Sequence, residues 1–239
     1  MNVLAFDTCF GACSAAVLRG AGPGATRLTC RFELCETGHA EALLPMIRAV
    51  MDESETAFAD LDRIAVTVGP GTFTGTRTAI AAARGLALAA RLPAVGASSL
   101  AVMAAGAERR LGGEGLSGNL AVAVDVRRGE VYAQLFERPG LVPRTAPLRL
   151  TYAAAARLGG ADSLLLAGSG ADKVAAEAAA LGRRVVVRLT DLQPDAADLA
   201  RMAPDLELGT EPVRPLYLRE PDVTLPFLET TAVQPIRNR

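Results

Sequence analysis

The chain contains one opening pattern twice, and this repeat limits the folds that it can adopt. Residues 2–8 read as a buried strand that ends around Asp7, and a turn and a second strand over 13–18 follow it. The same order of features begins again at residues 120–126, around Asp125. Short apolar runs bounded by turn residues are typical of strands. The repeat therefore predicts a duplicated α/β fold.

Alternating strands and helices follow each opening and divide the chain. We expect a first lobe over 1–108, a glycine- and arginine-rich linker over 106–118, and a second lobe over 119–223, with a partly disordered tail over 224–239. Helix 195–202 is a candidate to pack back on the first lobe. The remaining expected elements are a third strand at 27–34, a strand at 63–68, a helix at 77–91, a helix after Ser98-Ser99, a strand at 164–167, a helix at 171–181 and a strand at 185–189.

Composition argues against a membrane-spanning protein and against a protein that binds tRNA alone. Half of the 239 residues are hydrophobic, yet no apolar run reaches the roughly 18 residues of a membrane-spanning helix. The net charge is −1, whereas a protein that grips tRNA alone carries a positive excess. The four cysteines lack the Cys-x-x-Cys spacing of zinc sites, and we expect them to be buried small side chains. The N-terminus carries no basic leader, so we expect a cytoplasmic protein.

Two helices carry the clearest candidate interaction surface. The first has an apolar stripe at helical spacing, although Pro45 indicates either a kink there or a helix start nearby. The helix at 77–91 is thin, and Gly85 costs it about 1 kcal/mol, so we expect a packing reason. Such a stripe is more often core than interface, but a thin helix beside an apolar one suits a bundle shared between subunits. An Ile47→Asp substitution would then weaken association by burying an unpaired charge.

The loop Gly69–Gly75 joins a strand to a helix and is a candidate phosphate cradle. Backbone N–H groups and a helix N-terminus can together hold an anion. The loop lacks the lysine of a Walker motif, since Lys173 is the only lysine in the chain, and it also fails the dinucleotide-binding pattern. A structural or interface role for the loop is the alternative.

His39 is the only histidine, which restricts the chemistry available. A metal site built on two histidines of one helix is impossible, because Leu43 occupies the partner position. A Gly-x-Ser-x-Gly elbow is absent from the sequence, so a serine triad has no support. We expect His39 at a helix entry, with capping by Thr37 and Glu41.

These segments, in this order, resemble the TsaB (YeaZ) family. The resemblance covers roughly residues 2–222 and rests on LAFDTCFGACSAAVL, GHAEALLPMI, VGPGTFTGTRTAIAAARGLALAARLPAVGASSL, VDVRRGEVYAQLF and EPVRPLYLRE. It implies an actin-like ATPase (ASKHA) fold with two lobes of duplicated βββαβαβα type, related to TsaD.

The resemblance also implies a function. TsaB-like chains are non-catalytic subunits that work with TsaD and the ATPase TsaE in threonylcarbamoyl transfer to the adenosine 3′ of the anticodon of tRNAs. They pair with themselves and with TsaD through the first two helices, and contact tRNA only through the complex. Carried over by position, the contact residues are Leu43, Leu44, Ile47, Val50, Met51, Ala79, Ala83 and Ala87.

This sequence departs from nucleotide-hydrolysing relatives of that fold at both openings. In such folds an aspartate like Asp7 holds magnesium near ATP, but here Phe10 and the lack of an adjacent glycine block close backbone approach to phosphate. Asp7, Gly71 and Thr72 are therefore possible vestigial nucleotide contacts. The alternative is that Asp7 and Asp125 only bond to nearby turn amides. We expect no catalytic or metal site and no cofactor in the isolated chain, with a nucleotide possible at the complex interface.

Two other functions belong to different classes. An ATP-dependent small-molecule kinase of the same fold would need Asp7 on magnesium and glycine backbone at the phosphates. A metallopeptidase would need more ligands than the single His39 can supply.

Overall fold

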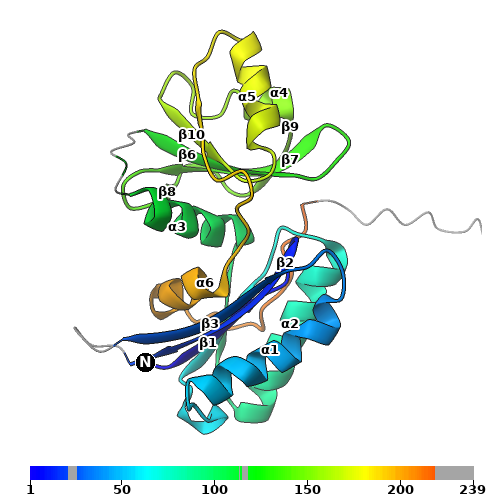
Figure 1. Ribbon diagram of the computed structural model, residues 1–239, viewed down its shortest axis with the longest axis vertical. Helices are drawn as coiled ribbons and strands as arrows, with labels where there is room; N and C mark the ends of the chain where they lie inside the picture. Colours follow the sequence, from blue (N-terminus) through cyan, green and yellow to red (C-terminus); the bar gives the residue numbers. More distant parts are fainter. Residues whose placement is uncertain (21–25, 113, 115–117, 219–239) are drawn as a thin grey trace, which may run out of the picture.

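The computed structural model describes residues 1–20, 26–112, 114 and 118–218, and contains two β-sheets, each with helices against it (Figure 1). The first sheet has five strands in the order β3-β2-β1-β4-β5. Its central strand β1 pairs antiparallel with β2 and parallel with β4. The strands are β1 (Val3–Asp7), β2 (Ala12–Arg19), β3 (Arg27–Leu34), β4 (Arg63–Thr67) and β5 (Ala94–Ala97).

The second sheet repeats this arrangement. Its strand β6 pairs antiparallel with β7 and parallel with β10, as β1 does with β2 and β4. The order is β11-β10-β6-β7-β8, with β9 also on β7. The strands are β6 (Asn119–Asp125), β7 (Glu130–Glu137), β8 (Val142–Pro143), β9 (Leu148–Thr151), β10 (Leu164–Ala167) and β11 (Val186–Val187). The predicted duplication is confirmed.

Successive side chains of β1 point to opposite faces of the first sheet, and different helices cover the two faces. Leu4 and Phe6 point to the face covered by α1 (His39–Glu53) and α2 (Phe73–Ala90). Val3 and Ala5 point to the opposite face, covered by α6 (Ala196–Met202). All four side chains have no exposed surface, so the first sheet lies between two helical layers.

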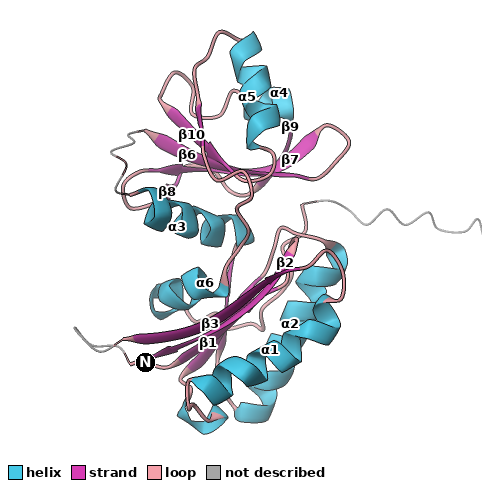
Figure 2. Ribbon diagram, viewed as in Figure 1, coloured by secondary structure: helices cyan, strands magenta, loops and turns pink. Residues whose placement is uncertain are grey.

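The second sheet is covered on one face by α4 (Tyr152–Ala155) and α5 (Ala171–Ala180), and on the other by α3 (Ser99–Leu111). Figure 2 shows α3 and α6 lying between the two sheets, where they contact each other. Two short 3₁₀ turns, η1 (Phe58–Asp60) and η2 (Ala203–Asp205), complete the described elements.

The structure corrects several expected boundaries. α2 begins at Phe73, so the preceding loop is shorter than predicted, and α3 runs to Leu111, so the linker begins later. Ser98 is the N-cap of α3 but makes no capping bond, and Pro45 lies inside α1. The sequence did not indicate β5, β8, β9 or α4. The tail over 224–239 lies outside the described residues.

The cysteines only partly follow the expectation. Cys9 and Cys13 are buried and Cys35 is half-buried, but Cys30 is exposed on β3. The expectation of four buried cysteines was therefore wrong for Cys30, because β3 is the last strand of its sheet and little covers it. Among the described residues, no helix is both long and apolar enough to cross a membrane.

Candidate functional site

The two helices α1 and α2 carry all eight residues predicted for the interface, and the structure places most of them in the core of this chain. The six with exposed fractions of 5% or less are Leu43, Ile47, Val50, Met51, Ala79 and Ala83. They pack against one face of the first sheet. Leu44 is 55% exposed, and Ala87 is half-buried. A partner that binds this face would therefore contact Leu44, while the buried residues would pack beneath Leu44 against the sheet.

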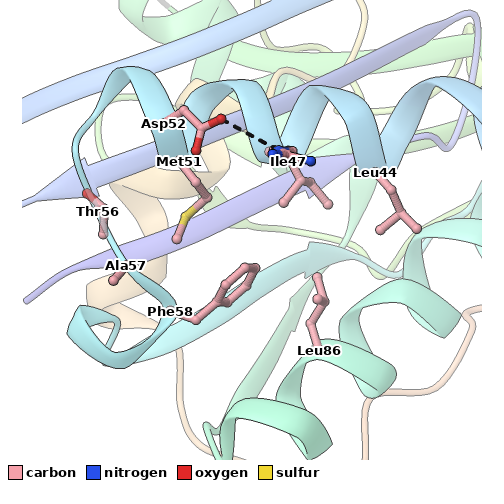
Figure 3. Close-up of a pocket in the computed structure, with 9 residues that line it drawn as sticks. Leu44, Ile47, Met51, Asp52, Thr56, Ala57, Phe58 and Leu86 are labelled. Atoms are coloured by element: carbon pink, nitrogen blue, oxygen red, sulfur yellow. Dashed lines mark ion pairs between the residues drawn. The ribbon is translucent and has the colours of Figure 1, made fainter.

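A groove of about 520 Å³ lies between α1, α2 and η1. Figure 3 shows Leu44 and Met51 on α1, Leu86 on α2 and Phe58 on η1 pointing toward one another around it. The groove is lined by Leu44, Ile47, Arg48, Met51, Asp52, Thr56, Ala57, Phe58 and Leu86. Sequence reasoning missed Phe58, because no periodicity connects it to either helix.

The outer surface of α2 around Gly85 has no partner among the described residues. A Cβ added at Gly85 would meet nothing within 4 Å, although the glycine costs the helix about 1 kcal/mol. The expected packing reason for Gly85 therefore does not lie among the residues that the structure describes. Ala81 and Ala89 are exposed on the same helix, which leaves its backbone accessible to a close neighbour.

His39 ties α1 to the β1–β2 hairpin. It is the first residue of α1 and is 9% exposed, and its Nε2 lies 2.9 Å from the carbonyl oxygen of Phe10. The predicted capping by Thr37 and Glu41 was wrong. The N-cap is Gly38 at φ 84°, and no side chain caps the helix. A left-handed backbone at this position favours glycine and leads the chain directly into the helix.

Asp7 is fully buried at the end of β1. Its Oδ1 accepts hydrogen bonds from the Thr67 hydroxyl and, at 3.2 Å, from the Cys9 amide, and its Oδ2 has no hydrogen-bond partner among the described residues. Burial raises the pKa of Asp7 from 3.8 to about 7, and the bonds from Thr67 and Cys9 oppose that rise. A carboxyl without exposed surface cannot hold a hydrated magnesium ion beside a nucleotide in this arrangement.

The β1–β2 hairpin, which would have to approach a bound phosphate, is covered on two sides. The Gly11 amide donates to Gln193 Oε1 at 3.1 Å, and the Thr72 amide donates to the Cys9 carbonyl oxygen at 2.7 Å. Thr72 also caps α2 by accepting from the Gly75 amide. A Cβ at Gly71 would lie 2.5 Å from that Cys9 oxygen, so the glycine permits the close approach of the loop. No pattern in the sequence pointed to Gln193.

The turn of the second hairpin, β6–β7, resembles the turn of the first hairpin, β1–β2. Asp125 Oδ1 accepts from the Arg127 amide at 3.1 Å, as Asp7 does from Cys9, so the expected bonds to turn amides are present in both. Tyr152 and Lys173 also donate to Asp125. Burial raises the pKa of Asp125, but these hydrogen bonds outweigh it and hold the pKa below its ordinary value.

The segment after η2 contacts the Gly69–Gly75 loop and the residues on either side of it. The Leu216 amide donates to the Val68 carbonyl oxygen at 2.7 Å. Tyr217 accepts from Arg77 Nε at 2.7 Å and stacks on Phe73, with ring centroids 5.8 Å apart. Sequence reasoning missed this contact, because nothing in the spacing joins residue 217 to α2. The described residues contain no group of three side chains suited to holding a metal ion.

Comparisons with known proteins find similar sequences and structures. A family model described as TsaD, tRNA N6-adenosine threonylcarbamoyltransferase, matches residues 33–147. The chain is 40% identical to the tRNA threonylcarbamoyladenosine biosynthesis protein TsaB of Escherichia coli over 58% of this chain and 56% of that protein. It is 30% identical to the Bacillus subtilis protein of the same name over 62% and 60%. The matched region thus spans little more than half the length of these curated relatives.

The duplicated sheets, in which the first strand of each hairpin ends in an aspartate, Asp7 or Asp125, define a protein of the actin-like ATPase fold. Among solved structures, YeaZ from Pseudomonas aeruginosa matches with a TM-score of 0.75 and 31% identity, over 91% of this chain and 99% of that one. The chain belongs to the TsaB (YeaZ) family.

Proposed function

We propose that this chain is a non-catalytic dimerisation and scaffold subunit, required with TsaD and TsaE for threonylcarbamoyl transfer to the adenosine 3′ of the anticodon in tRNAs. Family membership supports the pathway, because curated relatives carry the name tRNA threonylcarbamoyladenosine biosynthesis protein. On this proposal the chain works in the cytoplasm, and tRNA is contacted through the complex.

The observation that carries the docking part of the proposal is the open groove between α1, α2 and η1. Leu44, Phe58 and Leu86 give it an apolar lining, and burying such a lining under a partner is favourable at about 25 cal/mol per Å². The bare backbone at Gly85 would let a helix of the partner approach closely. We propose TsaD as the principal occupant and a second copy of this chain as the other.

The non-catalytic part rests on the hairpins. Asp7 has no exposed surface and the Gly11 amide already bonds to Gln193, so neither group is free for nucleotide chemistry. Docking would instead act on the partner, because a rigid face against TsaD can hold that subunit in its competent conformation. A nucleotide at the subunit interface is compatible with this proposal. We also propose that the lobes divide at 1–108 and 119–223.

Reconstitution tests the function directly. An unmodified tRNA transcript is incubated with TsaD, TsaE and threonylcarbamoyl-adenylate, with and without this chain, and the modified nucleoside is measured by mass spectrometry. We expect modification only when the chain is present. Equal modification in its absence would refute the proposal, and modification by the chain without TsaD would refute its non-catalytic role.

A further inference from the structure

Strand β3 forms one edge of the first sheet, and its outer side is unpaired among the described residues. All eight of its residues pair with β2, from Arg27 opposite Arg19 to Leu34 opposite Ala12. None of the eight is buried, and Phe32 and Leu34 are 41% and 74% exposed. A long exposed edge is a template for another strand unless something prevents pairing.

The ladder with β2 determines which backbone groups of β3 face outward. The Cys35 amide donates to the Gly11 carbonyl oxygen at 3.1 Å, which continues the β2–β3 ladder by one pair. Residues of an antiparallel strand alternate between the two neighbouring sides in their hydrogen bonding. The odd-numbered residues of β3 therefore bond to β2, and the even-numbered residues present their N–H and C=O groups to the open edge.

The side chains divide in the same alternation. Leu28 packs toward α6, on the face that also carries Cys30, Phe32 and Leu34. The opposite face carries the charged residues Arg27, Arg31 and Glu33, and Arg31 forms an ion pair with Glu53 of α1. One face of the edge is thus apolar, and the other has charges of both signs.

A second copy of β3 fits this edge best in one antiparallel register. In such a pairing, the outward-facing, even-numbered residues of one copy must lie opposite even-numbered residues of the other. The two-fold axis must therefore pass through a residue of β3, even- or odd-numbered, and not between two residues. With Cys30 on the axis, Arg27 lies opposite Glu33 of the second copy and Leu28 lies opposite its Phe32, each twice. Opposite charges and apolar pairs across strands are both favourable.

The neighbouring registers place like charges together. An axis at Thr29 puts Arg27 opposite Arg31 of the second copy twice, and an axis at Arg31 puts that residue opposite itself. An axis at Phe32 also places Arg31 opposite Glu33, but it keeps only residues 30–34 of each β3 in the pairing. We propose that β3 is a self-pairing edge, through which two copies of this chain join their first sheets into one continuous sheet with Cys30 on the two-fold axis.

This contact is separate from the groove between α1, α2 and η1, whose lining includes no residue of β3. Two copies joined at β3 would each keep that groove open for another subunit. The inference therefore goes beyond the proposed function, and either can fail without the other.

Charge exchange at β3 tests the pairing. All variants are made in a Leu44→Asp background, which removes self-association through the helical face. Sedimentation equilibrium over a concentration series then measures the dimerisation constant. We expect Arg27→Glu and Glu33→Arg each to weaken dimerisation about tenfold or more, since each places like charges opposite one another twice. The double exchange should restore the parental value, and Glu207→Arg, at an exposed position outside β3, should leave it unchanged.

Cross-linking supplies a second measurement. Cys9 and Cys13 are buried, so in a Cys35→Ser variant a short bismaleimide should join two copies through Cys30, and Cys30→Ser should abolish the product. A parent that stays monomeric across the series overturns the inference. A double exchange as weak as the single variants, or a dimer that does not cross-link through Cys30, also overturns it.

Discussion

Arg109 and Asp198 join α3 to α6 through two hydrogen bonds, Nε to Oδ1 at 2.7 Å and Nη2 to Oδ2 at 3.2 Å. Asp198 is 3% exposed, whereas the Arg109 side chain is 44% exposed. Gly106 leaves the room for this pair, because a Cβ there would lie 2.7 Å from Asp198 Oδ2. The bond thus connects the helical layers of the two sheets at their contact.

Removing this arginine should destabilise the chain. Among the described residues, Arg109→Ala leaves the buried Asp198 carboxylate paired with Arg201 alone, at 3.4 Å. Breaking a buried pair costs several kcal/mol, but the exposure of Arg109 reduces that, so we expect a loss of about 2 kcal/mol. Urea denaturation measures it. Arg214→Ala, which removes an exposed ion pair with Glu211, is the control and should change stability by under about 0.5 kcal/mol.

Asp7 should give stability an unusual dependence on pH. Burial raises its pKa from 3.8 to about 7, so between these values the folded chain binds a proton that the unfolded chain has released. The contribution of Asp7 to the free energy of unfolding is therefore fully present below about pH 4 and is lost as pH rises to about 7. The Asp7→Asn variant has no ionisable group at this position, so its free energy of unfolding should not show this loss.

Urea denaturation of wild type and Asp7→Asn at about pH 4, 6 and 8 isolates the effect, because other titrating groups are common to both. We expect the stability difference to move in favour of the variant by a few kcal/mol over this range. Any fixed cost of the buried amide is the same at every pH. Parallel pH profiles for the two proteins would contradict the buried, protonated carboxyl.

The sequence was sufficient for the fold because hairpins and βα units repeat as local patterns. Most strands and helices were predicted to within a few residues, and the duplicated α/β fold followed from them. What the sequence could not show is which apolar residues remain accessible. Leu43 and Leu44 are adjacent in one stripe, yet their exposed fractions are 1% and 55%. A helix turns about 100° per residue, so neighbours in a broad stripe face different surroundings.

Contacts between distant segments were equally beyond the sequence. Gln193 reaches Gly11 and Tyr217 reaches Arg77 across 182 and 140 positions of the chain, and single polar residues in loops carry no periodic signal. Gly106 read as part of a linker because glycine is typical of loops. Its actual role inside α3 depends on Asp198, which lies far later in the chain on α6.

Nucleotide binding by the isolated chain discriminates between a scaffold subunit and a kinase. We expect calorimetric titration with Mg-ATP to show no stoichiometric binding, because Asp7 has no exposed surface and the Gly11 amide bonds to Gln193. An actin-fold kinase that binds ATP tightly serves as the positive control. Saturable binding at one nucleotide per chain would favour the kinase and require the hairpin to open.

Leu44 and Ile47 should respond differently to the same charge, and the contrast tests the docking face. Leu44 is 55% exposed, so Leu44→Asp should leave the melting temperature nearly unchanged but weaken pairing with TsaD by about tenfold or more. Ile47 is 2% exposed, so Ile47→Asp places an unpaired charge in the core and should cost about 3 kcal/mol or more of stability. The expected effect of Ile47→Asp on association alone is therefore replaced by one on folding.

Leu181→Asp, at a 48% exposed leucine beside α5, is the matched control and should preserve both properties. Melting by circular dichroism and titration against TsaD by calorimetry give the two readouts for each variant. If Leu44→Asp binds TsaD as tightly as Leu181→Asp does, the groove between α1, α2 and η1 is not the docking surface. If Ile47→Asp melts like wild type, the packing of α1 on the first sheet is wrong, since a buried carboxylate without a partner cannot be tolerated there at neutral pH.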